Sequence, residues 1–466
     1  MSNALDTTRI QARIGELLAE YQIPSAAIGV LRDGEITDFA IGVKNVETRE
    51  PTTTDTVYQC GSLSKTWTAL AFMQFVDEGT VELDEPVRTY LPGFKVADPE
   101  VSAKVTPRHL LNHTNGIEEA FGDPGEGEDV LERMVENIVD APQVFPLGSS
   151  LGYSAALGSA ILGRIMEVVG GGRWDDLMRS RLFGPMGLTR TSTWRGQVDE
   201  TRAATSHVVK SPEAGASVLR TEEKYLPRAY GPGGNVNSTP REVLALAHVF
   251  LHGGKAPNGA QIVSPEIVHE MMASRVPIPE PYMFGPEWAL GLVVADWHGE
   301  TVFGHDGSTG GQTAHMRFLP DSNLAIAMMM NGSPRLSLFG RAFNEILSEL
   351  GAVTVPDLPE PDPNLKLDLS KYVGRYARLE NQYAIEAEGD RLYLSFIFDP
   401  RRAEAFGRDR LSYELLPIDE SHFLMRPLDP RDDPQPIALY DFEDGVPQFL
   451  HMTFRACPRV GDPQRP

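Results

Sequence analysis

The sequence has very little cysteine and no long apolar run. Only two of its 466 residues are cysteines, Cys60 and Cys457, which is too few for a disulfide framework or an all-cysteine zinc site. No apolar run approaches the ~20 residues that a membrane-spanning helix needs. The N-terminus also lacks the basic and apolar regions of a signal peptide. We therefore expect free thiols, no membrane partner and a cytoplasmic location.

Positive charge is also scarce. Lys and Arg total 42 and Asp and Glu total 65, so the net charge is −23. A surface of this sign repels nucleic acid and anionic membranes, which argues against both as partners. The hydrophobic content of 41% and the charged content of 23% are ordinary for a globular protein. The partner that we expect is a small-molecule or peptide substrate.

Strand signals occur at both ends of the first three quarters of the chain, with helix signals between them. Short apolar runs on either side of turn residues predict strands over residues 26–31, 35–41, 288–295, 301–304, 312–319 and 324–330. Helical periodicity predicts helices over residues 6–21, 62–78, much of 106–187, and 336–350. This order predicts an α/β domain of the α+β type, in which a helical insertion interrupts an antiparallel sheet.

A proline-rich stretch follows. Four prolines within residues 353–366 cannot join a strand ladder and stiffen the chain, so this stretch is typical of a linker. Beyond it, hairpin signals recur with almost no helical pattern, which predicts a small all-β barrel. The sequence thus predicts a first domain over residues 1–352, a linker over 353–366 and a barrel domain over 367–466.

Ser62 and Lys65 carry the strongest chemical signal. Residues three apart at the start of a helix share a face, and Ser62 would lie at the positive end of the helix dipole. A serine hydroxyl is a weak nucleophile that needs a base, and lysine can serve if burial lowers its pKa. The motif also occurs by chance, and the alternative is that Ser62 only caps the helix.

Further motifs give this pair a context. In order along the chain they are Ile23–Ala27, Gly61–Thr66, Thr106–Gly116, Tyr153–Ala155, Gly233–Thr239 and Gly304–Gly307. Over Asp6 to Leu350 the chain resembles the β-lactamase-related serine hydrolases. These include class C β-lactamases, D,D-carboxypeptidases, D-aminopeptidases, esterases and thioesterases of the penicillin-binding-protein type that cyclise non-ribosomal peptides. The last domain resembles the lipocalin-like domain that accompanies some of these enzymes. The resemblance implies a β-lactamase/transpeptidase-like fold.

The resemblance also implies catalytic roles. Ser62 matches the nucleophile, and Lys65 matches the lysine that helps to deprotonate it. Tyr153 matches the tyrosine that moves a proton, and nearby positive charge would favour its tyrosinate form. His305 stands where the family's Lys-Thr-Gly strand has lysine. We expect it to shape the pocket or assist, and to form a small basic spot with Lys65.

Four residues are candidates for substrate binding. Gly307 and Ser308 end the predicted strand, where the backbone N–H of Ser308 would complete an oxyanion hole with that of Ser62. Ala155 stands where the family often has an asparagine that holds a substrate amide, and either Asn235 or Asn237 can replace that contact. The absence of this asparagine and of the strand lysine favours an esterase or thioesterase over a β-lactamase.

We predict a serine hydrolase that forms an acyl-enzyme on Ser62. Its substrate would be an ester or amide of a small or D-configured peptide, and no cofactor is expected. Two alternatives stay open, namely cyclisation of a peptidyl thioester and, because of Ala155, a non-catalytic binding protein of the same fold. His109 and His113 are four residues apart, but this stretch lacks the zincin glutamate, so we expect no metal site.

Overall fold

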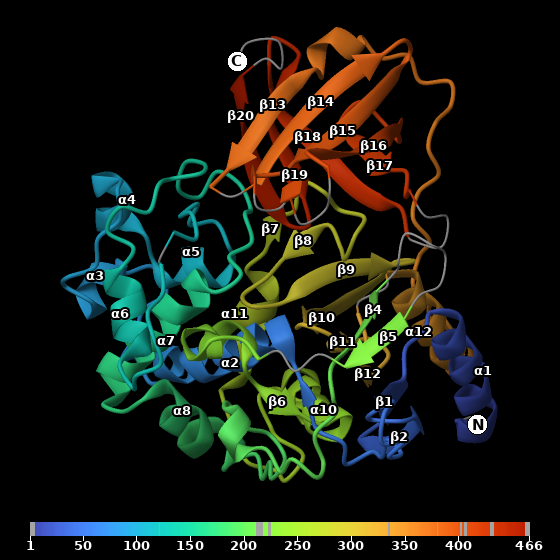
Figure 1. The fold of residues 1–466 in the computed structure, drawn as a ribbon. Coiled ribbons are helices and arrows are strands. Elements are labelled where there is room, and N and C mark those ends of the chain that lie inside the picture. The colour runs from blue at the N-terminus through green and yellow to red at the C-terminus, as the bar shows by residue number, and fades with distance from the viewer. Residues whose placement is uncertain are drawn as a thin grey trace.

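The computed structural model describes residues 5–120, 122–210, 218–221, 225–333, 336–379, 381–400, 403–404, 408–428 and 433–461. An open eight-stranded antiparallel sheet and a closed eight-stranded barrel are its two large β structures (Figure 1). In the described part of the chain, no helix combines the length and the apolar character that crossing a membrane requires. The open sheet and the closed barrel confirm the predicted fold class. The exact domain boundaries stay a prediction.

The open sheet joins strands from both ends of the first domain. Its strand order is β2-β1-β12-β11-β10-β9-β8-β7, so the N-terminal hairpin pairs with the last strand through β1 and β12. The strands are β1 (Ser25–Arg32), β2 (Glu35–Gly42), β7 (Val276–Pro277), β8 (Glu287–Trp288), β9 (Val293–Trp297), β10 (Glu300–Ser308), β11 (Thr313–Leu319) and β12 (Leu324–Met330). A continuous strand over residues 288–295 was predicted, and this prediction is wrong. The chain turns at Gly291, whose φ is +78°.

Helices cover both faces of this sheet. α1 and α12 pack on one face, and α2 and α10 lie against the other. Side chains alternate between the two cores along β1, as a strand buried on both faces requires. The helices are α1 (Thr7–Glu20), α2 (Ser64–Asp77), α3 (Val87–Tyr90), α4 (Pro99–Lys104), α5 (Pro107–Leu111), α6 (Val130–Glu136), α7 (Leu157–Gly170), α8 (Trp174–Leu177), α9 (Gly231–Gly234), α10 (Pro240–Leu251), α11 (Pro265–Ala273) and α12 (Leu336–Leu350). Two short pairs complete this part, β3 (Tyr58–Gln59) with β6 (Asn237–Ser238) and β4 (His207–Lys210) with β5 (Val218–Thr221).

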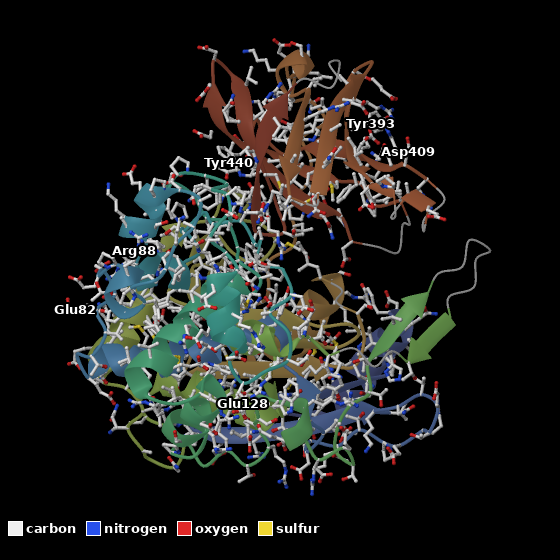
Figure 2. The ribbon with its side chains drawn as sticks, turned by 60° about the vertical axis from the view of Figure 1, so that its left-hand side comes forward. Glu82, Arg88, Glu128, Tyr393, Asp409 and Tyr440 are labelled. Atoms are coloured by element: carbon white, nitrogen blue, oxygen red, sulfur yellow. The ribbon has the colours of Figure 1, made fainter. Side chains whose placement is uncertain are left out.

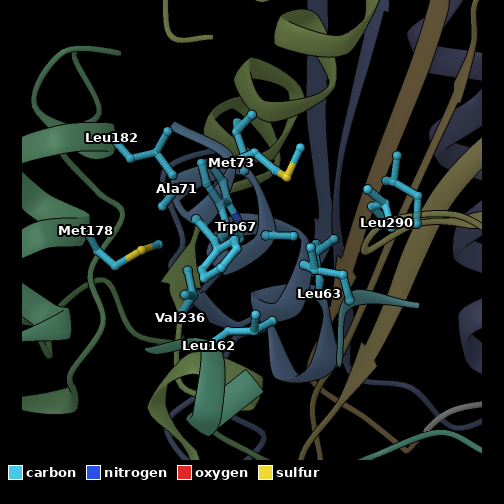
Figure 3. Packing of buried hydrophobic residues seen from close by; sticks show 14 of the residues in the cluster. Leu63, Trp67, Ala71, Met73, Leu162, Met178, Leu182, Val236 and Leu290 are labelled. Atoms are coloured by element: carbon cyan, nitrogen blue, oxygen red, sulfur yellow. The ribbon is translucent and has the colours of Figure 1, made fainter. Parts of the chain in front are cut away.

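The helix α2 lies in the middle of the larger core. Almost all of its residues are buried, which is typical of a helix surrounded by other elements. Figure 3 shows Trp67 at the centre of this packing, with Leu63, Leu162 and Met178 around it. The first turn of α2 is therefore held rigidly, and this turn carries Lys65.

The barrel has a filled interior. Its strands are β13 (Gly374–Arg378), β14 (Asn381–Glu388), β15 (Arg391–Ile397), β16 (Arg410–Pro417), β17 (His422–Met425), β18 (Gln435–Glu443), β19 (Val446–Met452) and β20 (Arg455–Gly461). Tyr376, Phe423, Leu439 and Leu450 are fully buried in its core. Eight strands enclose a space that side chains can fill. The barrel's contribution to a site must then come from its ends.

One end of the barrel is docked on the first domain, over the β7–β8 edge of the sheet (Figure 1). The hydroxyl of Tyr440 lies 2.9 Å from that of Ser150, and Figure 2 shows Tyr440 at this junction. The backbone N–H of Tyr153 donates to the carbonyl of Phe454 at 2.7 Å. Tyr153 is one of the predicted site residues, so the barrel contacts the candidate site directly.

Candidate active site

Ser62 lies in a tight turn that abuts strand β10. It belongs to the 3₁₀ turn η1 (Gly61–Leu63), and α2 begins only at Ser64, so the prediction that an α-helix starts at Ser62 is wrong. Residues three apart eclipse one another in a 3₁₀ turn, and the Nζ of Lys65 lies 3.4 Å from the Oγ of Ser62. The predicted pair is therefore brought together by a different local geometry.

Two glycines allow this close approach of backbones. A Cβ at position 307 would lie 1.8 Å from the carbonyl oxygen of Cys60, and one at position 61 would lie 2.5 Å from the backbone nitrogen of Ser308. Gly61 also has a φ of +51°, which favours glycine. These contacts place the N–H groups of Ser62 and Ser308 on adjoining segments of backbone. Ser308 is exposed at the strand end.

Lys65 is buried beside Ser62. Its side chain is buried, and its Nζ donates to the carbonyls of Ala155 at 2.7 Å and Gly233 at 2.9 Å. Burial lowers the pKa of Lys65 to about 7, opposed by the negative charge of Glu119 and assisted by the positive charge of Arg455. A substantial neutral fraction near pH 7 is what a general base requires. Ala155 thus enters the site through its backbone.

Tyr153 meets Ser62 from the other side. The Ser62 hydroxyl is its hydrogen-bond partner, and the Nζ of Lys65 lies 4.9 Å from its ring centre. Burial raises the pKa of Tyr153 well above its usual range, although Arg455 acts in the opposite direction. The expectation of a tyrosinate is therefore wrong, because desolvation outweighs the nearby positive charge. A neutral phenol can still accept one proton and donate another.

His305 lies near Tyr153, with their ring centres 6.4 Å apart, and is a neutral acceptor. Its Nδ1 donates to the carbonyl of Asp306 at 2.6 Å, and its Nε2 is buried without a hydrogen-bond partner among the described residues. Burial, together with the charge of Lys65, lowers the pKa of His305 to about 3. The prediction that Lys65 and His305 form a basic spot is therefore wrong for His305, which is neutral. His305 offers a lone pair where the family's lysine would offer a charge.

Sequence reasoning missed an ion-pair network on the opposite face of β10. The Asp306 carboxylate accepts from Arg317 at 2.6 and 3.0 Å and from the Nδ1 of His315 at 2.5 Å. Burial alone would raise the pKa of the Asp306 carboxyl. Arg317 and His315 outweigh burial and lower this pKa well below its usual range. This network fixes the strand that carries His305 and Gly307. Register could have revealed it, because Asp306 and His315 are direct partners in the sheet.

Sequence reasoning also missed Arg455, which reaches the site from the barrel. The turn between β19 and β20 consists of Thr453 and Phe454, with φ values of +49° and +63°. The strand β19 ends at Met452, directly before this turn. This turn places the guanidinium of Arg455 5.7 Å from the ring centre of Tyr153. Among the described residues, no carboxylate forms an ion pair with Arg455. No local sequence signal marks it, because its role depends on how the barrel is docked.

Asn235 follows two residues after Gly233, and its amide is held by a neighbouring loop. Its Nδ2 donates to the carbonyl of Pro227 at 3.0 Å. It lines a cavity of about 490 Å³ that opens next to Gly233, the residue whose carbonyl holds Lys65. The other lining residues include aromatic, amide and acidic side chains, namely Gln59, Glu126, Trp194, Glu200, Tyr225 and Asn237. The cavity is of a size that accepts one side chain or acyl group.

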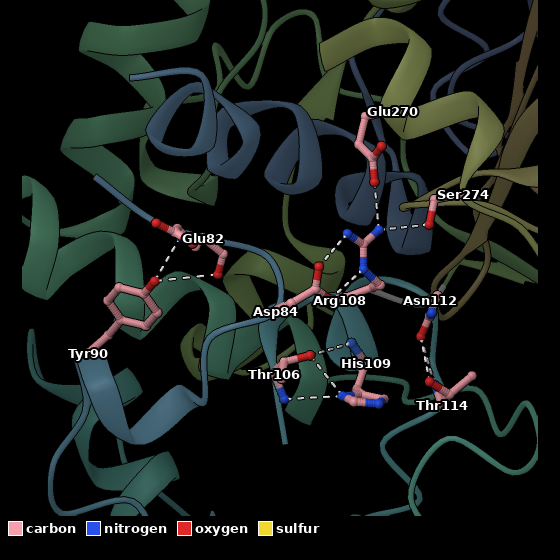
Figure 4. Close-up of polar contacts among 10 residues, drawn as sticks. All are labelled: Glu82, Asp84, Tyr90, Thr106, Arg108, His109, Asn112, Thr114, Glu270 and Ser274. Carbon is pink, nitrogen blue, oxygen red and sulfur yellow. Dashed lines mark hydrogen bonds and ion pairs between the residues drawn. The ribbon is translucent and has the colours of Figure 1, made fainter. Parts of the chain in front are cut away.

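The Thr106–Gly116 motif is structural. Figure 4 shows Arg108 between Asp84 and Glu270, bonded to them at 2.7 and 2.6 Å. His109 caps its own helix through Thr106, and α5 ends at Leu111, so His109 and His113 do not share a helix face. His113 instead packs with its ring centre 4.6 Å from that of Tyr153. Over the described residues, no group of three or more His, Cys, Asp or Glu side chains could hold a metal ion.

Comparison with known proteins agrees with this geometry. The protein-family model described as Beta-lactamase matches residues 10–349. The chain belongs to the β-lactamase family. It is 37% identical over 380 residues to penicillin-binding protein 4 of Amycolatopsis lactamdurans, covering 80% of this chain and 98% of that protein. A shorter match to esterase EstB of Burkholderia gladioli is 30% identical over 196 residues, 39% of this chain and 50% of the esterase.

Solved structures extend the likeness to the barrel. The crystal structure of SurE superposes with a TM-score of 0.78 at 26% identity, covering 97% of this chain and 98% of SurE. A second structure, of SurE with D-Leu, gives a TM-score of 0.74, again at 26% identity, and covers 97% and 99% of the two chains. The similarity therefore spans both β structures of this chain.

Proposed function

We propose that this β-lactamase-family protein is a serine hydrolase that forms an acyl-enzyme on Ser62. Its substrate would be an ester or amide of a small or D-configured peptide. The observation that carries the proposal is the Nζ of Lys65, which is buried, has a pKa of about 7 and lies 3.4 Å from the Ser62 hydroxyl. The named esterase among the relatives supports hydrolysis as the reaction class.

Acylation would begin with neutral Lys65. It accepts the proton of Ser62 as the Oγ attacks the substrate carbonyl and forms a C–O bond. The bond between the carbonyl carbon and the leaving group then breaks, and the leaving group takes the proton from Lys65 through the phenol of Tyr153. Water repeats the sequence in deacylation, releasing the acid and returning the proton to Ser62.

The role of Lys65 as base sets the pH dependence of the reaction. The rate should rise with pH through about 7 and then level, because protonated Lys65 cannot accept the proton of Ser62.

Charge that develops on the carbonyl oxygen needs fixed donors. The backbone N–H groups of Ser62 and Ser308 would supply them, since the glycines at 61 and 307 let the two segments touch. Loss of one such donor typically costs ~100-fold or more in rate. The rigid support of β10 by Asp306 and Arg317 would keep this geometry preorganised.

Two regions would hold the substrate on either side of Ser62. The cavity at Asn235 would take the acyl side. Arg455 and the Nε2 of His305 would face the leaving-group side, where a guanidinium suits a carboxylate and a lone pair suits an N–H. A substrate that ends in a carboxylate is therefore favoured over a neutral one.

A second candidate is peptide cyclisation. It rests on the resemblance to the cyclising thioesterases. The similarity to SurE, for which a structure with D-Leu is described, supports a D-configured residue in the substrate of either reaction. In cyclisation an amine of the bound peptide attacks the acyl-enzyme in place of water. A C–N bond forms, the bond to the Oγ of Ser62 breaks, and the amine proton returns to Ser62 through Lys65.

The test begins with intact mass spectrometry after incubation with a fluorophosphonate. An adduct on the wild type that is absent from Ser62→Ala supports the acyl-enzyme. A folded wild type without an adduct would favour the non-catalytic alternative. A p-nitrophenyl ester, a D-amino-acid amide and a peptidyl thioester are then offered in parallel. Linear acid from the ester or amide supports hydrolysis, whereas cyclic product with little linear acid from the thioester would replace hydrolysis by cyclisation.

A further inference from the structure

Glu119 occupies a position that none of the catalytic roles above explains. One oxygen of its carboxylate accepts from the hydroxyl of Ser154 at 2.6 Å and from the backbone N–H groups of Ala156 at 3.0 Å and Leu157 at 3.3 Å. The helix α7 begins at Leu157, and the Ala156 side chain makes no capping bond. Glu119 therefore caps α7 from a different segment, where negative charge is favoured.

The segment that Glu119 holds is the one that carries the site. Tyr153 precedes Ser154, and Ala155 accepts from the Nζ of Lys65 at 2.7 Å. A shift of this segment would move the phenol away from Ser62 and remove a carbonyl from Lys65 at the same time. The bonds to Glu119 thus fix two catalytic contacts through one carboxylate.

Glu119 also faces Lys65 electrostatically. The groups around Lys65 come from several elements: Glu119 and His113 from the loop after α5, Tyr153 from the loop before α7, His305 from β10 and Arg455 from the barrel turn. Burial keeps both histidines and the tyrosine neutral. Of these groups Glu119 carries the negative charge and Arg455 the positive one, so they act on Lys65 in opposite directions.

The neighbouring Glu118 extends this arrangement to the barrel. The backbone N–H of Glu119 donates to the Glu118 carboxylate at 2.9 Å. That carboxylate accepts twice from Arg378 at the end of β13, with the Nε contact at 3.0 Å. The side chains of Glu118 and Arg378 are only 7% and 10% exposed. A buried, two-pronged ion pair of this kind fixes position as well as charge.

We propose that Glu119 is a positioning residue for acylation, which holds the Tyr153–Ala155 segment and sets the charge balance at Lys65, and that the Glu118–Arg378 pair locks it to the barrel. The inference rests on the proposed role of Lys65 as base. It predicts that the barrel supports the catalytic lysine from two directions, through Arg455 and through this pair.

The test measures the rate of Ser62 modification by a fluorophosphonate as a function of pH in full-length protein. Glu119→Gln keeps the acceptor oxygen and removes the charge, so the neutral form of Lys65 becomes more favourable. We expect its acid limb to move to lower pH, with the rate at pH 6 rising roughly 3- to 10-fold and an unchanged plateau. Glu119→Ala should show the same shift and a plateau lowered about tenfold or more, because the segment loses its cap.

The matched control is Glu132→Gln. Glu132 lies on α6 and bonds to Arg164 of α7, so this variant removes a carboxylate that contacts the same helix as Glu119 but does not face Lys65. Its profile should coincide with that of the wild type. A Glu119→Gln profile that also coincides with the wild type, in a protein with an unchanged melting temperature, would overturn the inference.

A second readout separates this inference from the proposed function. The titration of Lys65 is followed by NMR in protein labelled with ¹³C-lysine, with its signal assigned by Lys65→Arg. A lower midpoint in Glu119→Gln supports the inference whether or not Ser62 reacts, and an unchanged midpoint overturns it. A wild type that is never modified on Ser62 overturns the proposed function instead.

Discussion

The open sheet and the closed barrel each have eight strands, but they contribute to the site in different ways. In the sheet, the functional residues lie along β10, where Gly307 permits backbone contact with the nucleophile's turn. In the barrel, buried side chains fill the interior. The residues that reach the candidate site lie at the rim, namely Phe454 in a turn, Arg455 directly after it and Arg378 at the end of β13. The sheet therefore carries His305 and abuts the turn of Ser62 through β10, whereas the barrel brings charged side chains to the candidate site from its rim.

The largest effect should come from the nucleophile. Ser62→Ala should lower turnover by ~10⁴-fold or more, because no other group can form the acyl-enzyme. Ser64→Ala is the matched control, since the hydroxyl of Ser64 accepts from the backbone N–H of Val236 at 3.0 Å and is fully buried. Ser64→Ala should retain most of its activity. Turnover of one ester by both variants measures the difference, and equal losses would contradict the assignment of Ser62.

The next largest effect concerns the junction between the two β structures. Arg378→Met leaves the Glu118 carboxylate buried without its partner, and we expect a loss of ~3–5 kcal/mol in the free energy of unfolding. The double variant with Glu118→Gln should recover most of this loss, since no charge is then left unpaired. Urea titration compares the two proteins. A single variant as stable as the wild type would show that the ion pair does not hold the barrel in place.

The two regions also differ in how much the sequence could predict. The hairpin at β1 and β2 and the helix α12 follow from local periodicity and turn residues. The order of the predicted elements also indicated one sheet with strands from both ends of the first domain, but not that β1 pairs with β12. Ser62 and Lys65 follow from their spacing. Arg455 could not be predicted, because its position depends on a left-handed turn and on docking across more than 300 residues of sequence. The charge states of Tyr153 and His305 likewise depend on burial, which spacing does not report.

Arg455 tests the barrel's chemical contribution. Arg455→Met should lower kcat/KM by ~10- to 100-fold for substrates that end in a carboxylate and far less for their neutral amides. Loss of the positive charge should also raise the pKa of Lys65, so the acid limb of the rate profile should move to higher pH, opposite to Glu119→Gln. Arg426→Met is the control, because this exposed arginine pairs with Glu414 on the barrel and does not face the site. Equal losses for acid and amide would rule out a carboxylate contact.

His305 should give the smallest effect, and its Gln and Leu variants together distinguish a lone pair from a charge. Because burial holds its pKa at about 3, His305 contributes no positive charge at pH 7, and His305→Gln can keep an acceptor near the position of Nε2. We expect Gln to lower kcat/KM by no more than about threefold and Leu by about tenfold, the value of one hydrogen bond. Neither variant should move the acid limb of the pH profile, since neither changes the charge facing Lys65. A shift in that limb for His305→Leu would mean that the sheet, like the barrel, acts on the lysine through charge.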